Sequence, residues 1–350
     1  MTEYSSFFSD KNILVTGNTG FIGSWLTKWL SLFDSEICGY SLGPPSTPNL
    51  YGVLGIEHVI KDVRSDIRDK KLLKNTIQEF QPEIVFHLAA QPIVLDSYDN
   101  PVETFDTNVT GTVNLLNELR QVDSVKTIIV MTSDKSYRNN EWVYPYREND
   151  ILGGKDPYSA SKSCQDIVVE SFRESYFSIS EVGISSVRAG NVIGGGDWGK
   201  YRIVPDIIRA INSNNAVTLR NPNSIRPWQH VMELISGMLL LGKKMYENQK
   251  FSGAWNFGPE PWSAKTVKEL TELFIQYYGK GKYEIETTSN AKESGYLQID
   301  ISKAKKELGW KPRYDTEESL KKTVEWYKSY YDSVEIDKFT EKQIYDYWKE

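Results

Sequence analysis

The sequence predicts an α/β fold: a doubly wound parallel sheet with helices on both faces, plus a smaller C-terminal α/β substrate-binding domain. Short apolar runs alternate with segments of helical periodicity up to about residue 190, which is typical of a parallel sheet. A glycine-rich loop, GNTGFIG, directly follows the first apolar run, NILVT, at residues 12–16. A glycine loop between a first strand and a first helix indicates a Rossmann domain.

The predicted elements follow one another in a regular order. Strands are expected at residues 12–16, 36–42, 83–90, 125–133 and 183–192. Helices are expected at residues 24–33, 70–80 and 108–121, around Tyr158, just after Asp300 (where Gly309 and Pro312 end it) and, as the final element, at 317–331.

Beyond residue 191 the sequence becomes rich in loops, aromatic residues and arginines, as in GGGDW and RNPNSIRPWQHV. We therefore assign residues 1–190 to a dinucleotide-binding domain, with a returning segment near residues 228–255. Residues 191–227 and 256–350 are assigned to the substrate-binding domain.

Composition excludes several classes of protein. Of the 350 residues, 39% are hydrophobic and 25% are charged, as in ordinary globular proteins. A net charge of −6 argues against a general nucleic-acid binder. The chain has neither an apolar run of membrane length nor a signal-peptide pattern, so no membrane association and a cytoplasmic location are expected.

Cysteine and histidine usage points to neither disulfides nor metal. Cys38 and Cys164 are far apart in the sequence and are expected to be reduced, buried thiols. His58, His87 and His230 do not have the spacing of metal ligands, so no metal site is predicted. We expect His87 to pack beside the cofactor cleft.

The glycine loop predicts a dinucleotide site. Its three glycines permit a tight turn and let a pyrophosphate approach the amides at the start of the following helix. Cofactor contacts are expected from Gly17, Thr19, Gly20, Phe21, Ile22 and Gly23, and from Leu88, Ala89 and Ala90 at the end of a later strand.

The residues around the adenosine leave the choice between NAD and NADP open. Tyr40, Ser41 and Leu42 stand where a ribose-binding acid is usually expected, and there is no arginine there for a 2′-phosphate. Asp66 and Ile67 are expected to hold the adenine. The alternative for these two is a helix cap followed by a buried apolar residue.

Ser133, Tyr158 and Lys162 form a candidate reaction centre. Tyr158 and Lys162 are four residues apart on a predicted helix and therefore share one face, where an ammonium can lower the pKa of the phenol. Ser133 ends the preceding strand and can steady a substrate oxygen. Asn108 is expected to order the lysine or to start a helix. This set suits the oxidation of a sugar hydroxyl.

These motifs carry a resemblance to a known family. GNTGFIGSWLTKWL, HLAAQPIV, NPVETFDTNVTGTVNLL, TSDKSY, DPYSASK, RAGNVIGGGDW, IRPWQHV and DISKAKKELGWKP together resemble the extended short-chain dehydrogenase/reductases. Within their sugar-nucleotide branch the chain resembles the CDP-sugar 4,6-dehydratases. The resemblance runs nearly end to end.

The resemblance implies an internal redox cycle on CDP-glucose with tightly held NAD. Tyr158, assisted by Lys162 and Ser133, would take the C4 hydroxyl proton while a hydride leaves C4. Water would then be lost across C5 and C6, and the hydride would return to C6. A homodimer built from helices of the dinucleotide-binding domain is also implied.

Asp134 and Lys135 are assigned to the elimination. Related dTDP-glucose dehydratases have an Asp-Glu pair here, whereas this chain has Asp134-Lys135, as in the CDP-glucose enzymes. Asp134 can protonate the leaving C6 hydroxyl if burial raises its pKa. Lys135 is expected to act at C5, either as a base with a lowered pKa or by stabilising the enolate.

The substrate is expected to lie against the C-terminal half of the chain. The family pattern places Asn191 near the sugar diphosphate, and arginines suit phosphate oxygens. The expected substrate contacts are Gln91, Asn191, Arg202, Arg220, Arg226 and His230, with structural packing an equal alternative for His230.

Three alternatives remain open from the sequence. The chain can be a sugar-nucleotide 4-epimerase, which needs no elimination acid. It can also act on a dTDP- or GDP-sugar, because the base-binding loops are not placed by sequence. A non-catalytic dinucleotide-binding regulator is a third reading, but such a protein has no reason to keep Ser133, Tyr158 and Lys162 together.

Overall fold

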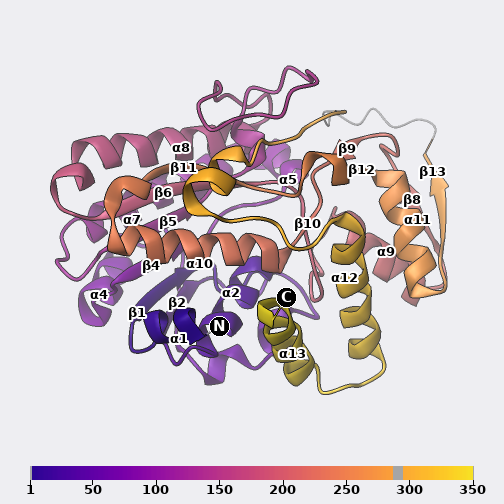
Figure 1. The fold of residues 1–350 in the computed structure, drawn as a ribbon, viewed down its shortest axis with the longest axis horizontal. Helices are drawn as coiled ribbons and strands as arrows, with labels where there is room; N and C mark the ends of the chain where they lie inside the picture. Colours follow the sequence, from indigo (N-terminus) through magenta and orange to yellow (C-terminus); the bar gives the residue numbers. More distant parts are fainter. Residues whose placement is uncertain (1, 287–294, 350) are drawn as a thin grey trace.

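The centre of the molecule is a seven-stranded parallel sheet, as expected from the sequence (Figure 1). A computed structural model describes residues 2–286 and 295–349. The strand order is β11-β6-β5-β4-β1-β2-β3. The strands are β1 (Asn12–Thr16), β2 (Glu36–Ser41), β3 (Lys61–Arg64), β4 (Ile84–His87), β5 (Thr127–Met131), β6 (Gly183–Ala189) and β11 (Gly253–Phe257).

Alternate strand residues face two separate cores. Ile13 and Val15 of β1 pack in one core, whereas Leu14 between them packs in the other. The first core is covered by α2 (Phe21–Ser31) and α10 (Val231–Glu247), and the second by α4 (Lys70–Phe80), α7 (Gly111–Leu119) and α8 (Pro157–Ser175). Figure 1 shows α10 crossing the sheet, so the segment 231–247 returns to the dinucleotide-binding lobe. Helices therefore cover both faces, and the predicted fold class is confirmed.

The strand order places a ligand crevice at the glycine loop. β1 lies between β2 and β4, so the connections leaving β1 and β4 run in opposite directions along the sheet. Ligands of doubly wound sheets bind at the carboxyl ends of the strands at such a switch point. Short helices in the connection after β4, α5 (Val94–Asp99) and α6 (Pro101–Phe105), border this edge together with α8.

The second lobe consists of short paired strands and helices. The pairs are β10 (Gln229–His230) with β7 (Val192–Ile193), β12 (Lys265–Thr266) with β9 (Ile225–Arg226), and β13 (Lys282–Ile285) with β8 (Ala216–Leu219). The helices are α9 (Ile203–Asn212), α11 (Val267–Tyr278) and α12 (Thr316–Tyr331). The sequence predicted an α/β lobe here but did not predict the individual helices α9 and α11.

The helix predicted at residues 317–331 is not the final element. α13 (Ile336–Lys349) follows α12 and packs against α2, where Lys28 forms ion pairs with Asp337 (2.6 Å) and Glu341 (2.8 Å). An N-terminal helix, α1 (Thr2–Phe8), was also not predicted. The rings of Tyr4 and Trp348 lie 4.4 Å apart, so the two terminal helices are neighbours (Figure 1).

Both cysteines are free thiols, as expected, but only Cys38 is buried, and Cys164 is half-buried. Across residues 2–286 and 295–349, none of the helices is both long and apolar enough to span a membrane.

Candidate active site

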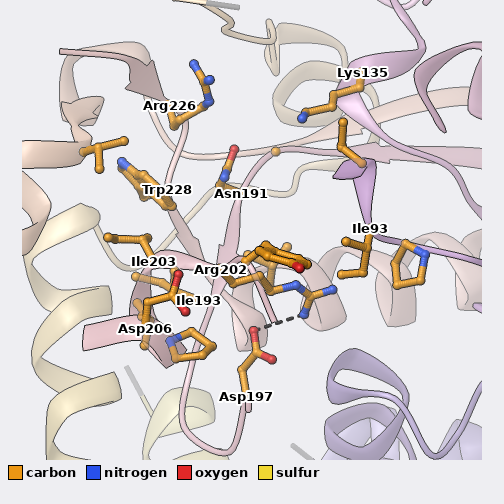
Figure 2. Close-up of a pocket in the computed structure, with 18 of the residues that line it drawn as sticks. Ile93, Lys135, Asn191, Ile193, Asp197, Arg202, Ile203, Asp206, Arg226 and Trp228 are labelled. Carbon is orange, nitrogen blue, oxygen red and sulfur yellow. Dashed lines mark hydrogen bonds and ion pairs between the residues drawn. The ribbon is translucent and has the colours of Figure 1, made fainter. Parts of the chain in front are cut away.

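A cavity of about 640 Å³ lies between the two lobes. Its walls contain residues from the end of β5, the start of α8, the segment that follows β6, and α9. Figure 2 shows Lys135, Asn191, Arg202 and Arg226 around the same space. Of the residues predicted to act on substrate, Ser133, Asp134, Lys135, Tyr158, Asn191, Arg202, Arg220 and Arg226 line this cavity.

The glycine loop has the close packing that a dinucleotide site requires. Gly17 has a φ of 75°, and a Cβ there would lie 2.7 Å from the Ala89 nitrogen. A Cβ on Gly23 would lie 2.1 Å from the Gly17 oxygen, so the start of α2 rests directly on the loop. Gly20 precedes α2 and offers no side-chain cap for its first amides. The loop therefore fits a phosphate group at the helix N-terminus.

Neighbouring residues brace this loop. The Thr19 hydroxyl donates to the Leu42 carbonyl (3.0 Å) and lies 3.0 Å from the Ser41 hydroxyl. Phe21 and Ile22 reach the cavity. Sequence reasoning found no arginine near the end of β2, but Arg64 from β3 reaches the Leu42 carbonyl (3.0 Å). Its charge is paired with Asp62 at 2.7 Å.

Tyr158 is buried at the start of α8, which Asp156 caps by accepting from the Ser159 amide at 2.9 Å. Burial raises the pKa of Tyr158 to about 12, and a hydrogen bond with Ser133 and the charge of Arg202 only partly oppose this. The structure therefore differs from the expected phenol with a lowered pKa.

Among the hydrogen bonds of the described residues, none joins Lys162 to the Tyr158 hydroxyl. Its Nζ donates to the Met131 carbonyl (3.1 Å) and to Gln165 Oε1 (2.8 Å) instead. Burial lowers the pKa of Lys162 to about 8. The lysine is buried one turn further along α8 than the tyrosine, and its partners come from the last residue of β5 and from the middle of α8.

Asp134 is buried in the cavity wall and has a raised pKa. Burial raises its pKa to about 6, although Lys135 and Arg226 pull the pKa down. Its Oδ1 accepts from the Ser133 hydroxyl at 3.2 Å. Its Oδ2 is buried without a hydrogen-bond partner among the described residues, and Asp134 itself lines the cavity. The adjacent Lys135 is half-buried and extends into the cavity (Figure 2).

Arg202 is held by an ion pair that sequence reasoning missed. Its Nη1 lies 3.0 Å from Oδ2 of Asp197, and this pair is drawn in Figure 2. Oδ1 of Asp197 accepts from the Gly199 amide (2.9 Å). Asp197 stands in the motif GGGDW, five residues before Arg202, and that proximity in the sequence was the available signal. Trp228, the neighbour of Arg226 in RPWQHV, also lines the cavity.

The other two arginines differ in their surroundings. Arg226 is buried on β9, close enough to Asp134 to act on its pKa. Arg220 is exposed near the end of β8, with its guanidinium 5.9 Å from the centre of the Tyr201 ring.

Two predicted substrate contacts are not brought to the cavity. Gln91 uses its side chain locally, donating to the Thr104 hydroxyl (2.9 Å) and accepting from the Ile93 amide (2.5 Å). Pro92 and Ile93 line the cavity in its place. His230 is fully buried, where its Nδ1 accepts from the Met232 amide at 3.2 Å and caps α10. His230 therefore has the structural packing role that was the alternative to substrate contact.

Two predicted adenine contacts also lie outside the cavity lining. Asp66 is paired with Arg68, whose Nη2 lies 2.7 Å away and lowers the aspartate pKa. Ile67 is buried against Gly111, and a Cβ added to Gly111 would lie 2.6 Å from Cγ2 of Ile67. The cap of α4 is Asp69 rather than Asp66, and it accepts from the Leu72 amide at 3.1 Å.

Asn108 orders the loop after β4 rather than Lys162 directly. Its Oδ1 accepts from the Gln91 amide (2.8 Å), and its Nδ2 donates to the Ser161 hydroxyl (2.8 Å). It lies in a π-helical turn, Asp106–Thr110, a feature that is frequent at functional sites. His87 is fully buried between Thr16 and Thr112, with hydrogen bonds at both ring nitrogens.

The class of protein follows from comparison with known families. The family model described as GDP-mannose 4,6 dehydratase matches residues 14–323. The chain therefore belongs to this family of extended short-chain dehydrogenase/reductases, and the resemblance carried by the motifs is confirmed.

The chain is also similar to individual dehydratases and epimerases. The chain is 44% identical over 349 residues to the CDP-glucose 4,6-dehydratase of Salmonella typhimurium, which covers 98% of this chain and 97% of that protein. The UDP-glucose 4-epimerase of Thermotoga maritima, solved with UDP-glucose, is 26% identical with a TM-score of 0.79, over 91% of this chain and 99% of that one. The dTDP-glucose 4,6-dehydratase of Bacillus anthracis, solved with NAD, shares the fold at 24% identity and a TM-score of 0.78, over 93% and 98% of the two chains.

Proposed function

We propose that this protein is a 4,6-dehydratase that converts CDP-D-glucose to CDP-4-keto-6-deoxy-D-glucose and water. The observation that carries the proposal is the buried Asp134, with a pKa of about 6 and a free Oδ2, on the same cavity wall as Tyr158. An elimination needs such an acid, and a 4-epimerase does not. The 44% identity to the Salmonella CDP-glucose enzyme supports the choice of substrate.

NAD is the proposed cofactor, held by the glycine loop and by the ends of β1 and β4. When bound, NAD would serve as the hydride acceptor for C4 and as the hydride donor to C6. Arg64 reaches the Leu42 carbonyl just after β2 and is already paired with Asp62, and this neutralised charge favours NAD over NADP. Gly17, Gly20 and Gly23 keep side chains away from the pyrophosphate.

Tyr158 takes the proton of the C4 hydroxyl, and Ser133 steadies the same oxygen. Burial raises the pKa of the phenol to about 12, so Tyr158 can accept this proton only as the phenolate, a form that nearby positive charge must stabilise. Arg202 supplies part of this charge and Lys162 the rest. The C4 ketone then makes the C5 hydrogen acidic.

Asp134 gives its proton to the C6 hydroxyl, which leaves as water. Lys135 acts at C5, where its side chain removes the proton or stabilises the enolate. Arg226, Arg202 and Asn191 bind the sugar diphosphate, and Arg220 contributes at the exposed end of the cavity. The product differs from the substrate by one molecule of water, so no external reductant is consumed.

Lys135→Ala tests the assignment at C5. The variant is expected to retain bound NAD and to lose exchange of the C5 hydrogen with deuterated solvent. Lys155→Ala, which removes an exposed lysine shortly before α8, serves as the matched control. Normal turnover by Lys135→Ala would remove this residue from the mechanism.

The substrate assignment is tested by incubating the purified protein with CDP-, dTDP- and GDP-glucose and following the 4-keto product. Product from CDP-glucose alone is expected. Product only from another nucleotide would overturn the CDP assignment and retain the dehydratase class, whereas epimerised sugar without a ketone would favour the 4-epimerase.

The assembly and location are part of the same proposal. We infer a homodimer through the helices at the α6 and α8 side, where the apolar side chains of Val102 and Ile167 are 73% and 56% exposed. We infer a cytoplasmic enzyme, which agrees with the free thiols of Cys38 and Cys164.

A further inference from the structure

A continuous path of buried hydrogen bonds joins the glycine-loop side of the sheet to Lys162. The Ala89 amide donates to the Thr16 hydroxyl (3.2 Å), which lies 2.7 Å from Nδ1 of His87. Nε2 of His87 lies 2.9 Å from the Thr112 hydroxyl, and Nε2 of Gln165 donates to the same hydroxyl at 2.8 Å. Apart from Ala89, the residues of this path and Lys162 at its end are buried.

The proton directions along this path follow from the chemistry of its members. The Thr112 hydroxyl has one proton, which it donates to the Asn108 carbonyl at 2.8 Å. It must therefore accept from both Gln165 and His87. Nε2 of His87 then carries the imidazole proton, and Nδ1 accepts from Thr16. Burial lowers the pKa of His87 to about 3, so the neutral ring that this pattern requires is the stable form.

Gln165 is fixed in one orientation by this arrangement. Its amide nitrogen is directed at Thr112, so its oxygen faces Nζ of Lys162 at 2.8 Å. Nζ of Lys162 also donates a hydrogen bond to the Met131 carbonyl at 3.1 Å. Within the described part of the chain Nζ donates these two hydrogen bonds, and an ammonium has a third proton for the reaction centre.

We propose that Gln165 is a positioning residue for Lys162, oriented by Thr112 and His87, which sets both the place and the charge state of the lysine. The proposal rests on the proposed function, because it assumes that Lys162 assists Tyr158. Gln165 does not line the substrate cavity, so it acts through Lys162 and not on the sugar.

The charged groups around Lys162 do not offset the effect of burial on its pKa, so the hydrogen bond to Gln165 matters for its charge state. Asp166 raises the pKa of the lysine, but this carboxylate is shared with Arg188, whose Nε lies 3.1 Å from it. His87 on β4 is neutral. Burial is the larger effect and lowers the pKa of Lys162 to about 8, so the acceptor oxygen of Gln165 stabilises an ammonium that is close to losing its proton.

Two substitutions at Gln165 are expected to move the pKa of Lys162 in opposite directions. Gln165→Met keeps the side-chain size and removes the acceptor, so the pKa falls below that of the parent protein. Gln165→Glu places a carboxylate against the ammonium and raises the pKa by about one unit or more. The measurement is NMR titration of protein labelled at lysine Cε, with the Lys162 signal identified by its loss in Lys162→Met.

Turnover of CDP-glucose provides a second readout. Gln165→Met is expected to lower kcat about tenfold, with KM within about twofold, because an interaction outside the cavity does not alter substrate binding. The pH profile of kcat should shift with the NMR pKa in both variants. Thr112→Val is expected to give a weaker shift in the direction of Gln165→Met, because the amide of Gln165 is then free to rotate.

Val169→Ala is the matched control, one turn further along α8 and also buried. It should lower stability without moving the pKa of Lys162, and circular dichroism would show that all variants fold. Equal titration of Lys162 in the parent protein and in both Gln165 variants would overturn the proposal. If the parent protein lacks dehydratase activity, the proposed function fails, while the NMR titration still decides the role of Gln165.

Discussion

At the scale of single residues, burial outweighs neighbouring charge at Tyr158. The hydroxyl of this tyrosine has Ser133 as a hydrogen-bond partner and Arg202 as a nearby cation, yet burial still raises its pKa to about 12. The same effect acts on Asp134 in the opposite functional sense, because a raised pKa turns an aspartate into a usable acid. Burial in one cavity wall thus raises the pKa of both groups.

The pH dependence of turnover tests the role of Asp134. Its acid form predominates below its pKa of about 6 and is lost as the pH rises, so kcat should decline through this range if elimination limits the rate. Asp134→Asn keeps the shape and removes the proton. We expect it to lower kcat by about 10²–10⁴-fold and to abolish that decline. An unchanged kcat and profile would contradict the assignment.

Local motifs predicted much of the candidate site, because Ser133, Asp134 and Lys135 are adjacent in the sequence and Tyr158 begins a capped helix. The orientation of Gln91 away from the cavity was not predictable in the same way. Its side chain faces Ile93 and Thr104, and only the folded loop determines that choice. His230 is similar, since its capping of α10 depends on a helix that the sequence reading did not define.

At the scale of elements, α13 shows why some helices escape sequence prediction. Its buried positions include Thr340 and Gln343 as well as Ile344 and Tyr347, so the apolar periodicity is weak. The helix is stabilised by tertiary contacts instead. The hydroxyl of Tyr347 lies 3.0 Å from Oε2 of Glu233 and 2.9 Å from the Ser236 hydroxyl, which ties α13 to α10.

Tyr347→Phe is expected to destabilise the protein and leave its chemistry unchanged. The substitution removes these hydrogen bonds and leaves buried polar groups of α10 less satisfied, which lowers the free energy of unfolding by about 1–3 kcal/mol. Urea unfolding measures the loss. Tyr345→Phe, at a more exposed tyrosine of the same helix, should change it little. Equal stability of the two variants would show that α13 is not held through Tyr347.

At the scale of the whole molecule, the sheet and its two cores were predictable because alternating strands and helices permit few topologies. The substrate lobe was not, because its strands are as short as two residues and provide no periodic signal. Its contribution to the cavity follows from tertiary placement of Arg202 and Arg226 beside Tyr158 and Asp134. The site exists only where both lobes meet.

The proposed dimer is tested by Ile167→Glu, which introduces a charge on the exposed face of α8. We expect the variant to sediment as a monomer with an unchanged circular dichroism spectrum, since the parent side chain is not part of either core. Val59→Glu, at a similarly exposed apolar residue beside β3, should remain dimeric. Sedimentation of the parent protein as a monomer would show that the proposed dimer does not form.

The central claim is that one site oxidises C4, eliminates water across C5 and C6, and reduces C6. The most direct measurement is NMR analysis of the product formed from CDP-glucose deuterated at C4, in ordinary water. We expect a 4-keto-6-deoxy sugar with the deuterium at C6 of the same nucleotide sugar. Deuterium released to the solvent, or retained at C4 of an epimerised sugar, would contradict it.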